Sequence, residues 1–294
     1  MIRTAIVPVA GMGTRLLPAT KAVPKELLHV FDMPVLERIV EELVTAGIEK
    51  IIFVTHPGRK GAIEAHFTPD PFLEQQLAAK GKQQLLEKVQ RTHTMAEYHF
   101  AVQEEPLGSG HAVLQALPFL DNNDEAVVVC FGDDLVDTGS APNAVEQLLR
   151  IYEDYGCPSY YVMSVPREDV SAYGVIDPGP GYTEGDAVVP VCGFSEKPTP
   201  AAAPSNLISI GKYVVTRPVL DLLESQEQGA GNEINFPEAI ERHRQAGNPV
   251  MAAVMDGQRF DTGTHLGLLH AVVHYAHQQH PDAVAAIVRP YGEA

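Results

Sequence analysis

Residues 4–26 read TAIVPVAGMGTRLLPATKAVPKE, and this stretch indicates both the fold class and the first candidate site. Its apolar opening is typical of a buried β-strand, which runs directly into a loop containing Gly11 and Gly13. A glycine loop after a buried strand brings backbone N–H groups close to an anion, because no Cβ stands in the way. The cations that follow, Arg15 and Lys25, add charge for several phosphates. The stretch therefore predicts a cradle for a nucleoside triphosphate.

The glycine spacing differs from two common phosphate-binding motifs. The dinucleotide fingerprint G-x-G-x-x-G needs a third glycine where this chain has Leu16, which argues against a nicotinamide dehydrogenase. The P-loop needs Gly-Lys-Ser/Thr at its end, and no such sequence follows at that spacing. An ordinary turn explains a lone Gly-x-Gly, but Arg15, Lys21 and Lys25 close behind the loop favour phosphate binding in a chain this acidic.

Composition limits the class of partner. A formal net charge of −17 over 294 residues argues against a general nucleic-acid binder, since phosphate backbones demand clustered basic surface. It leaves room for a nucleotide enzyme, because a few cations in a cleft can hold a triphosphate. Cys130, Cys157 and Cys192 form no zinc or disulfide spacing, and the apolar run at 4–10 is too short for a membrane span or secretory signal. We therefore expect a cytoplasmic protein without nucleic-acid or membrane partners.

Strand-like and helix-like segments alternate along nearly the whole chain. Strands are expected at residues 4–9, 50–55, 98–102, 126–131, 159–165, 188–194, 207–215 and 250–255. Helices are expected at 34–47, from 61, at 72–90, 110–117, 142–155 and 236–245, and from about 265. Such alternation predicts an α/β fold, with a mostly parallel central sheet flanked by helices.

The segment at residues 167–211 differs in composition from the rest of the chain. Between residues 167 and 211 the chain has short strands, glycines and prolines, which indicate a small β lobe covering the substrate. Regular elements return afterwards, and residues 265–294 are expected to form a C-terminal helical segment. The simplest organisation is one domain over residues 1–294 with the lobe inserted in it.

Acidic residues follow the ends of two predicted strands. Asp133 and Asp134 close the run at 126–131, and ligands of open parallel sheets bind beyond the carboxyl ends of the strands. Hard oxygen ligands beside a phosphate substrate favour Mg²⁺. Successive side chains of a strand point in opposite directions, so only one of the two is expected to reach the pocket. Asp261 follows the strand at 250–255 and could reach the same edge, although alone it reads as a helix cap or turn residue.

Several longer motifs resemble those of bacterial UTP–glucose-1-phosphate uridylyltransferases. The resemblance starts with VPVAGMGTRLLPATKAVPKELL and covers nearly the whole chain. It continues through VTH at 54–56, LGSGHAV at 107–113, AYGVI at 172–176, EKP at 196–198, APSNL at 203–207 and GAGNEI at 229–234. The family implies a Rossmann-like nucleotidyltransferase fold. It also implies a Mg²⁺-dependent reaction in which UTP and glucose 1-phosphate give UDP-glucose and pyrophosphate.

The resemblance also implies a role for each candidate residue. It gives phosphate binding and catalysis to the cations Arg15, Lys25 and Lys197. It gives nucleotide binding to Ala10, Gly11, Gly13, Thr14, Gln103 and Gly108, sugar binding to Gly174, Glu196 and Lys197, and the metal to Asp133 and Asp261. Gln103 offers both a donor and an acceptor, which suits the imide edge of uracil. Without the resemblance, Glu196-Lys197-Pro198 reads as an exposed turn, although a lysine there could cancel the charge of a sugar phosphate.

Departures from the family pattern keep alternatives open. Residues 104–107 (EEPL) replace the commoner glycine-bearing segment beside the expected base site, so dTTP or another sugar 1-phosphate stays possible. A catalytically silent nucleotide-sugar sensor is disfavoured, because such a protein would be expected to lose charges that are all present here. The family further suggests a homodimer or homotetramer.

Overall fold

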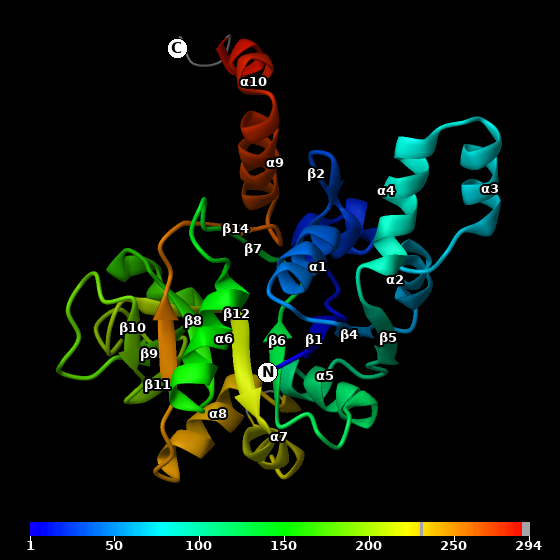
Figure 1. Ribbon diagram of the computed structural model, residues 1–294. Helices are drawn as coiled ribbons and strands as arrows, with labels where there is room; N and C mark the ends of the chain where they lie inside the picture. Colours follow the sequence, from blue (N-terminus) through cyan, green and yellow to red (C-terminus); the bar gives the residue numbers. More distant parts are fainter. Residues whose placement is uncertain (230–231, 290–294) are drawn as a thin grey trace.

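A ten-stranded sheet forms the centre of the computed structural model, which describes residues 1–229 and 232–289 (Figure 1). Eight strands lie side by side in the order β10-β13-β8-β12-β6-β1-β4-β5, and β9 and β11 join the sheet through β12. Their bounds are β1 Thr4–Val9, β4 Lys50–Thr55, β5 Glu97–Val102, β6 Ala126–Cys130, β8 Ser159–Ser164, β9 Gly174–Asp177, β10 Val188–Pro190, β11 Gly193–Glu196, β12 Leu207–Thr216 and β13 Met251–Val254. Two small sheets pair β2 (His29–Val30) with β3 (Met33–Pro34), and β7 (Asp134–Asp137) with β14 (Gln258–Asp261).

Along the eight-strand order, four of the seven neighbouring pairs run parallel: β13 with β8, β6 with β1, β1 with β4, and β4 with β5. β1 pairs in parallel with β4 and β6, so that Ile6 lies opposite both Ile52 and Val129. β12 is antiparallel to both of its main-sheet neighbours, β6 and β8. The expected strand at 188–194 is instead divided, because β10 pairs with β13 while β11 crosses to pair with β9. The prediction of a mostly parallel Rossmann-like α/β fold is confirmed.

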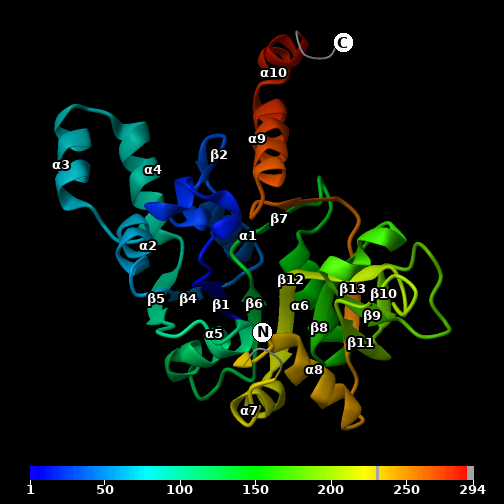
Figure 2. The same cartoon turned by 180° about the vertical axis from the view of Figure 1, so that it is seen from behind.

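Helices cover both faces of the sheet, and strand alternation supplies the two apolar surfaces (Figures 1 and 2). Along β1, Ala5, Val7 and Val9 pack in one core cluster while Ile6 packs in the other, as expected from the period of two. The first cluster includes residues of α1 (Val35–Thr45) and α6 (Ala144–Tyr155). The second includes residues of α5 (Ser109–Ala116), α7 (Arg217–Glu224) and α8 (Phe236–Gln245).

Two helical elements extend from this body in both views (Figures 1 and 2). One is the hairpin of α3 (Pro71–Ala79) and α4 (Gln83–Thr94), which follows α2 (Lys60–His66) and turns at Gly81, with φ +65°. The other is α9 (His265–Gln279) followed by α10 (Pro281–Val288). Residues 290–294 of the predicted C-terminal segment lie outside the described residues. The strands between 167 and 211 pair within the central sheet, and the division into a domain and a lobe stays a prediction.

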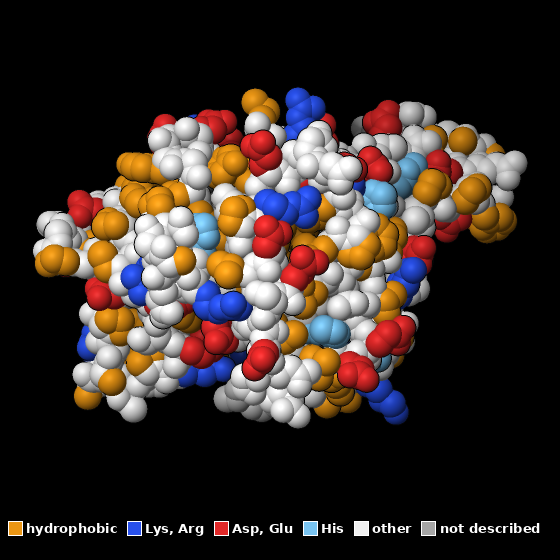
Figure 3. Space-filling view, turned by 90° about the horizontal axis from the view of Figure 1, so that it is seen from below, with side chains coloured by type: hydrophobic (Ala, Val, Ile, Leu, Met, Phe, Trp, Pro, Cys, Tyr) orange, Lys and Arg blue, Asp and Glu red, His pale blue; other side chains and the backbone are white. Residues whose placement is uncertain are grey.

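One face of the molecule is mixed in charge. On the face in Figure 3, acidic and basic side chains are interspersed among hydrophobic ones, and neither sign gathers into a broad patch. This face lacks the clustered basic surface that a nucleic-acid backbone requires. Within residues 1–229 and 232–289, no helix is both long enough and apolar enough to cross a bilayer.

Candidate active site

The loop after β1 has a conformation that depends on glycine. Gly13 has φ +62°, in the left-handed region, and a Cβ there would lie 3.2 Å from Thr20 Cγ2. Thr20 is fully buried, and its hydroxyl donates a hydrogen bond of 2.7 Å to the Gly13 carbonyl. At Gly11, a Cβ would lie 3.7 Å from Lys25 Nζ. The glycines therefore let the loop fold back on itself, with the lysine ammonium close to its backbone.

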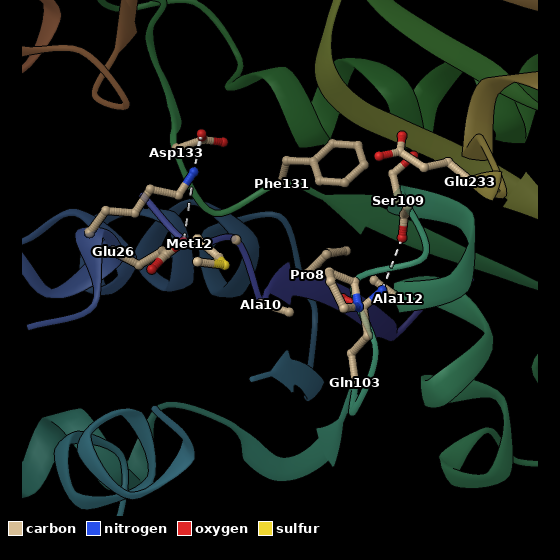
Figure 4. Close-up of a pocket in the computed structure, with 14 residues that line it drawn as sticks. Pro8, Ala10, Met12, Glu26, Gln103, Ser109, Ala112, Phe131, Asp133 and Glu233 are labelled. Carbon is tan, nitrogen blue, oxygen red and sulfur yellow. Dashed lines mark hydrogen bonds and ion pairs between the residues drawn. The ribbon is translucent and has the colours of Figure 1, made fainter. Parts of the chain in front are cut away.

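A cleft of about 300 Å³ lies at the carboxyl ends of β1 and β6 and the start of α5 (Figure 4). It is lined by Pro8, Ala10, Gly11, Met12, Lys25, Glu26, Gln103, Pro106, Gly108, Ser109, Ala112, Phe131, Asp133 and Glu233. In Figure 4, Asp133 and Glu26 lie at one end, and Gln103 lies at the other. The cleft thus has a charged end beside the glycine loop and an amide end beside α5.

The charged end is built around Lys25. Its ammonium forms an ion pair with Asp133 and lies 3.8 Å from Glu26 Oε1. Burial lowers the pKa of Lys25, but the carboxylates of Asp133 and Glu26 outweigh this effect and raise the pKa overall. Lys25 is therefore a fixed cation at neutral pH, although only 15% of its side chain is exposed.

Glu26 is an unusual neighbour for this lysine. The residue is 1% exposed, and its Oε2 atom has no hydrogen-bond partner within the described part of the chain. Burial raises the pKa of Glu26 to about 7, and the Lys25 charge opposes that shift only in part. Burying a polar atom without a hydrogen-bond partner costs folding free energy. The protein therefore carries this cost at its candidate site.

Because the pKa of Glu26 is raised, the free energy of unfolding should fall as the pH rises. The unfolded carboxyl ionises near 4.5 and the folded one near 7, so between these values the folded protein holds more protons. The free energy of unfolding should therefore fall with rising pH by about 3 kcal/mol more in the wild type than in Glu26→Gln, whose side chain stays neutral. Urea unfolding at about pH 5 and about pH 8 measures this difference. Glu87→Gln, on the exposed face of α4, is the control, and equal slopes in wild type and Glu26→Gln would contradict the prediction.

The two aspartates after β6 point to different partners, as predicted, although Asp133 lies in the turn before β7 and only Asp134 belongs to a strand. Asp133 lines the cleft, whereas Asp134 is buried and accepts from Arg259, with Nη2 2.5 Å from Oδ1. Because β7 pairs with β14, Asp261 lies opposite Asp134 in the register and comes close to Asp133. Asp261 Oδ2 lies 3.5 Å from Arg15 Nη1.

Gly263 marks the point where the charged side chains converge. A Cβ at this position would lie 3.0 Å from Asp261 Oδ1, 3.2 Å from Asp133 Oδ2 and 2.7 Å from Arg15 Nη2. The absent side chain leaves space shared by two carboxylates, and carboxylate oxygens are the ligands that Mg²⁺ prefers. Among the residues described, no group of three or more His, Cys, Asp or Glu side chains is placed to hold a metal. The donors present therefore fit an ion that takes its other ligands from phosphate or water.

The amide end of the cleft is formed by Gln103. Its Nε2 donates to the Gly108 carbonyl at 3.0 Å and lies 3.1 Å from His111 Nδ1. Gly108 has φ +96°, and a Cβ there would lie 2.7 Å from the Ile234 carbonyl oxygen. The loop and α5 thus fix the amide so that its nitrogen is used within the protein. The Gln103 oxygen accepts no hydrogen bond from the described residues and is left for a ligand donor.

The predicted sugar-side residues lie together on β9 and β11. Glu196 is paired with Gly174, where a Cβ would lie 2.3 Å from Phe194 Cζ. Lys197 follows with φ +47°, and its ammonium is 3.6 Å from Glu196 Oε1. Its side chain is 63% exposed and lies outside the lining of the cleft. A row of aromatic rings links the two regions: Phe131, Tyr213, Tyr160 and Phe194, with successive centroids 6.0, 5.5 and 5.7 Å apart.

The structure brings several of the predicted site residues together and places further residues beside them. Six predicted residues line the cleft: Ala10, Gly11, Lys25, Gln103, Gly108 and Asp133. Arg15 and Asp261 meet beside Gly263, whereas Gly13 and Thr14 belong to the loop but do not line the cleft. Sequence reasoning missed Arg259, which pairs with Asp134, and the cleft residues Ser109 and Glu233. The last two fall within quoted family motifs, which could have indicated them; Ala230 and Gly231 of the second motif lie outside the described residues.

A glycine loop after the first parallel strand, a largely buried lysine and strand-end aspartates fit a nucleotidyltransferase of the α/β class. The chain belongs to the nucleotidyl transferase family, whose sequence profile matches residues 4–278. It is 45% identical over 275 residues to the UTP–glucose-1-phosphate uridylyltransferase of Staphylococcus epidermidis RP62A, covering 94% of this chain and 92% of the relative. The enzyme of the same name from Bacillus subtilis 168 is 42% identical over 277 residues, with the same shares covered.

Solved structures agree with these relatives. The UDP-glucose pyrophosphorylase from Acinetobacter baumannii superimposes with a TM-score of 0.87 at 37% identity, covering 99% of both chains. A UTP-bound form of the enzyme from that organism has the same TM-score and identity, covering 100% of this chain and 99% of that one. A UDP-glucose pyrophosphorylase complexed with UDP-glucose gives 0.83 at 30% identity, covering 95% of this chain and all of that one.

Proposed function

We propose that this enzyme transfers the uridylyl group of UTP to glucose 1-phosphate, giving UDP-glucose and pyrophosphate. The observation that carries the proposal is the cleft between Lys25 and Gln103, which has a cationic end for phosphates and a free amide oxygen for a base. Relatives of 42–45% identity bear the name of this activity, and similar structures hold UTP or UDP-glucose.

Each cation is assigned to one phosphate group. Lys25 and Arg15, which flank Asp133 and Asp261, would neutralise the β- and γ-phosphates of the nucleotide. Lys197 would neutralise the phosphate of the sugar, and Glu196 beside it would accept hydrogen bonds from sugar hydroxyls. The nucleotide cleft lies at the Phe131 end of the aromatic row and the sugar-side residues at its Phe194 end, which gives one site for each substrate.

A divalent metal belongs to this proposal, since nucleotidyl transferases of this kind generally use one. Asp133 and Asp261 would hold Mg²⁺, because their oxygens share the space beside Gly263. When bound, the ion would offset negative charge on the phosphates and help to orient them.

The reaction we propose is a direct in-line displacement. An oxygen of the sugar phosphate attacks the α-phosphorus of UTP, the new P–O bond forms, and the bond to pyrophosphate breaks with its electron pair leaving on pyrophosphate. The nucleophile is already an anion, so no general base is required. The barrier lies in repulsion between two polyanions and in charge on the leaving group, so positioning and fixed cations would supply most of the catalysis.

The nearest alternative is the same chemistry with dTTP or another sugar 1-phosphate. The free oxygen of Gln103 can accept the imide N–H of a pyrimidine, and uracil and thymine share that group. A silent nucleotide-sugar sensor is less favoured, because Arg15, Lys25, Asp133 and Asp261 are all present and grouped. Assembly as a homodimer or homotetramer and a cytoplasmic location stay predictions.

A substrate panel tests the proposed function. Turnover of glucose 1-phosphate with UTP, dTTP, CTP and ATP, each with and without Mg²⁺, is followed by pyrophosphate release. We expect UTP with Mg²⁺ to be preferred, and removal of Mg²⁺ to abolish turnover. Equal or faster release with dTTP would favour the alternative, and no release with any nucleotide would refute the enzyme activity.

A further inference from the structure

Arg59 forms hydrogen bonds with the backbone of the glycine loop. It lies four residues after the end of β4 and immediately before α2, and among the residues described its guanidinium donates only to backbone carbonyls of residues 11, 12 and 20. Nη1 lies 3.3 Å from the Gly11 oxygen, and Nη2 lies 2.8 Å from the Met12 oxygen and 3.0 Å from the Thr20 oxygen. Among the residues described, no carboxylate forms an ion pair with Arg59. Its charge also acts on the nearby carboxyl of Glu26, but its hydrogen bonds to described residues all go to the loop.

The planar peptide bond transmits this contact to the other side of the loop. In a trans peptide the C=O and N–H bonds point in opposite directions. Hydrogen bonds to the Gly11 and Met12 oxygens therefore turn the N–H groups of Met12 and Gly13 away from Arg59. Neither N–H group has an acceptor within the described part of the chain, and Gly11 and Met12 line the cleft. The loop thus has free donors held in a fixed direction, and such donors suit an anion.

The third contact joins the two ends of the loop. Thr20 accepts from Arg59 through its carbonyl and donates through its hydroxyl to the Gly13 carbonyl. One guanidinium therefore fixes residues 11, 12 and 20 relative to one another. A hydrogen bond to a peptide oxygen also polarises the peptide and strengthens its N–H as a donor.

We propose that Arg59 is a positioning residue for the phosphates of the nucleotide: it orients the peptides of the glycine loop so that their N–H groups face the ligand. This inference rests on the proposed function, because it assigns the loop to the triphosphate. A merely structural role would affect folding and both substrates alike. A positioning role affects the ligand that contacts the loop.

The experiment compares Arg59→Ala, Arg59→Gln and Arg59→Lys with the wild type. Steady-state kinetics gives kcat and the KM of each substrate, and calorimetry gives the affinity for UTP and for inorganic pyrophosphate. For Arg59→Ala we expect the UTP KM and the pyrophosphate Kd to rise about tenfold or more, since charged donors are lost from two loop peptides. The KM of glucose 1-phosphate should stay within about twofold. Arg59→Lys should recover part of the loss, because an ammonium can still donate to one or two of the carbonyls, and Arg59→Gln should recover less.

Arg242→Ala is the matched control. Arg242 also donates to a backbone carbonyl, that of Leu222 at 2.9 Å, but it lies on α8 outside the cleft. Unchanged UTP and pyrophosphate binding in Arg59→Ala, or an equal rise in both KM values, would overturn the inference. A protein that binds pyrophosphate with the expected dependence on Arg59 but turns over no UTP would instead refute the proposed function alone. Thermal unfolding of each variant separates these outcomes from loss of the fold.

Discussion

Replacing Lys25 with methionine should lower kcat by about 100- to 1,000-fold while the protein stays folded, the range found when one charge-stabilising donor is removed from an active site. Lys25 is the cation in the lining of the cleft, and its ammonium lies beside the glycine loop and contacts Asp133. In the proposed reaction it offsets charge that grows on the departing pyrophosphate. That contribution is largest in the transition state, so kcat should fall more than the UTP KM rises.

The design of this test follows from the neighbours of Lys25. Methionine keeps the length of the stem and removes only the charge, and protonation of Glu26 limits the cost of leaving carboxylates unpaired. Lys25→Arg should retain more activity than Lys25→Met, because the charge is preserved. Lys88→Met, on the exposed face of α4, controls for loss of a lysine elsewhere. Wild-type kcat in Lys25→Met, with a normal melting temperature, would remove Lys25 from the catalytic residues.

The central elements could be predicted from the sequence because local patterns determine them. β1 and β4 have the expected bounds, since both are short apolar runs bounded by loop residues. α1 follows from apolar residues spaced three and four apart, with Pro34 before its first residue and Gly47 just after its end. In each case the signal lies within a single window of sequence.

Elements that depend on distant partners could not be predicted. β7 and β14 are four residues each and pair across more than 100 positions, so neither has a pattern of its own. Their pairing nevertheless decides the site, because it carries Asp261 to the side of Asp133. α7 was also missed, since its eight residues follow β12 without an intervening loop.

Some features of the candidate site could likewise be predicted from the sequence, and others could not. Alternation along a strand predicts that Asp133 and Asp134 face different partners. The ion pair of Asp134 with Arg259 agrees with that outcome, although the turn at Asp133 and not alternation produces it. Arg59 has no comparable signal, because its partners are backbone carbonyls and these carry no sequence pattern. The burial of Glu26 is also invisible in the sequence, where a glutamate after a lysine normally indicates an exposed pair.

Lys197→Ala should reduce kcat/KM for glucose 1-phosphate by about 100- to 1,000-fold and leave the affinity for UTP within about twofold. The ammonium of Lys197 is on the sugar side, apart from the lining of the nucleotide cleft. In the proposed reaction it meets the attacking phosphate. Because 63% of the side chain is exposed, its removal should cost little stability.

The backbone at Lys197 requires a second variant. With φ +47°, this residue occupies a region that glycine adopts at less cost, so alanine could act through the backbone as well as through the charge. Lys197→Gly relieves that constraint and removes the same charge. If the charge matters, both variants lose the same large factor, as measured by pyrophosphate release at varied glucose 1-phosphate. If Lys197→Gly keeps wild-type kcat/KM, the ammonium does not contact the sugar phosphate, and the anion site must lie elsewhere along β9 and β11.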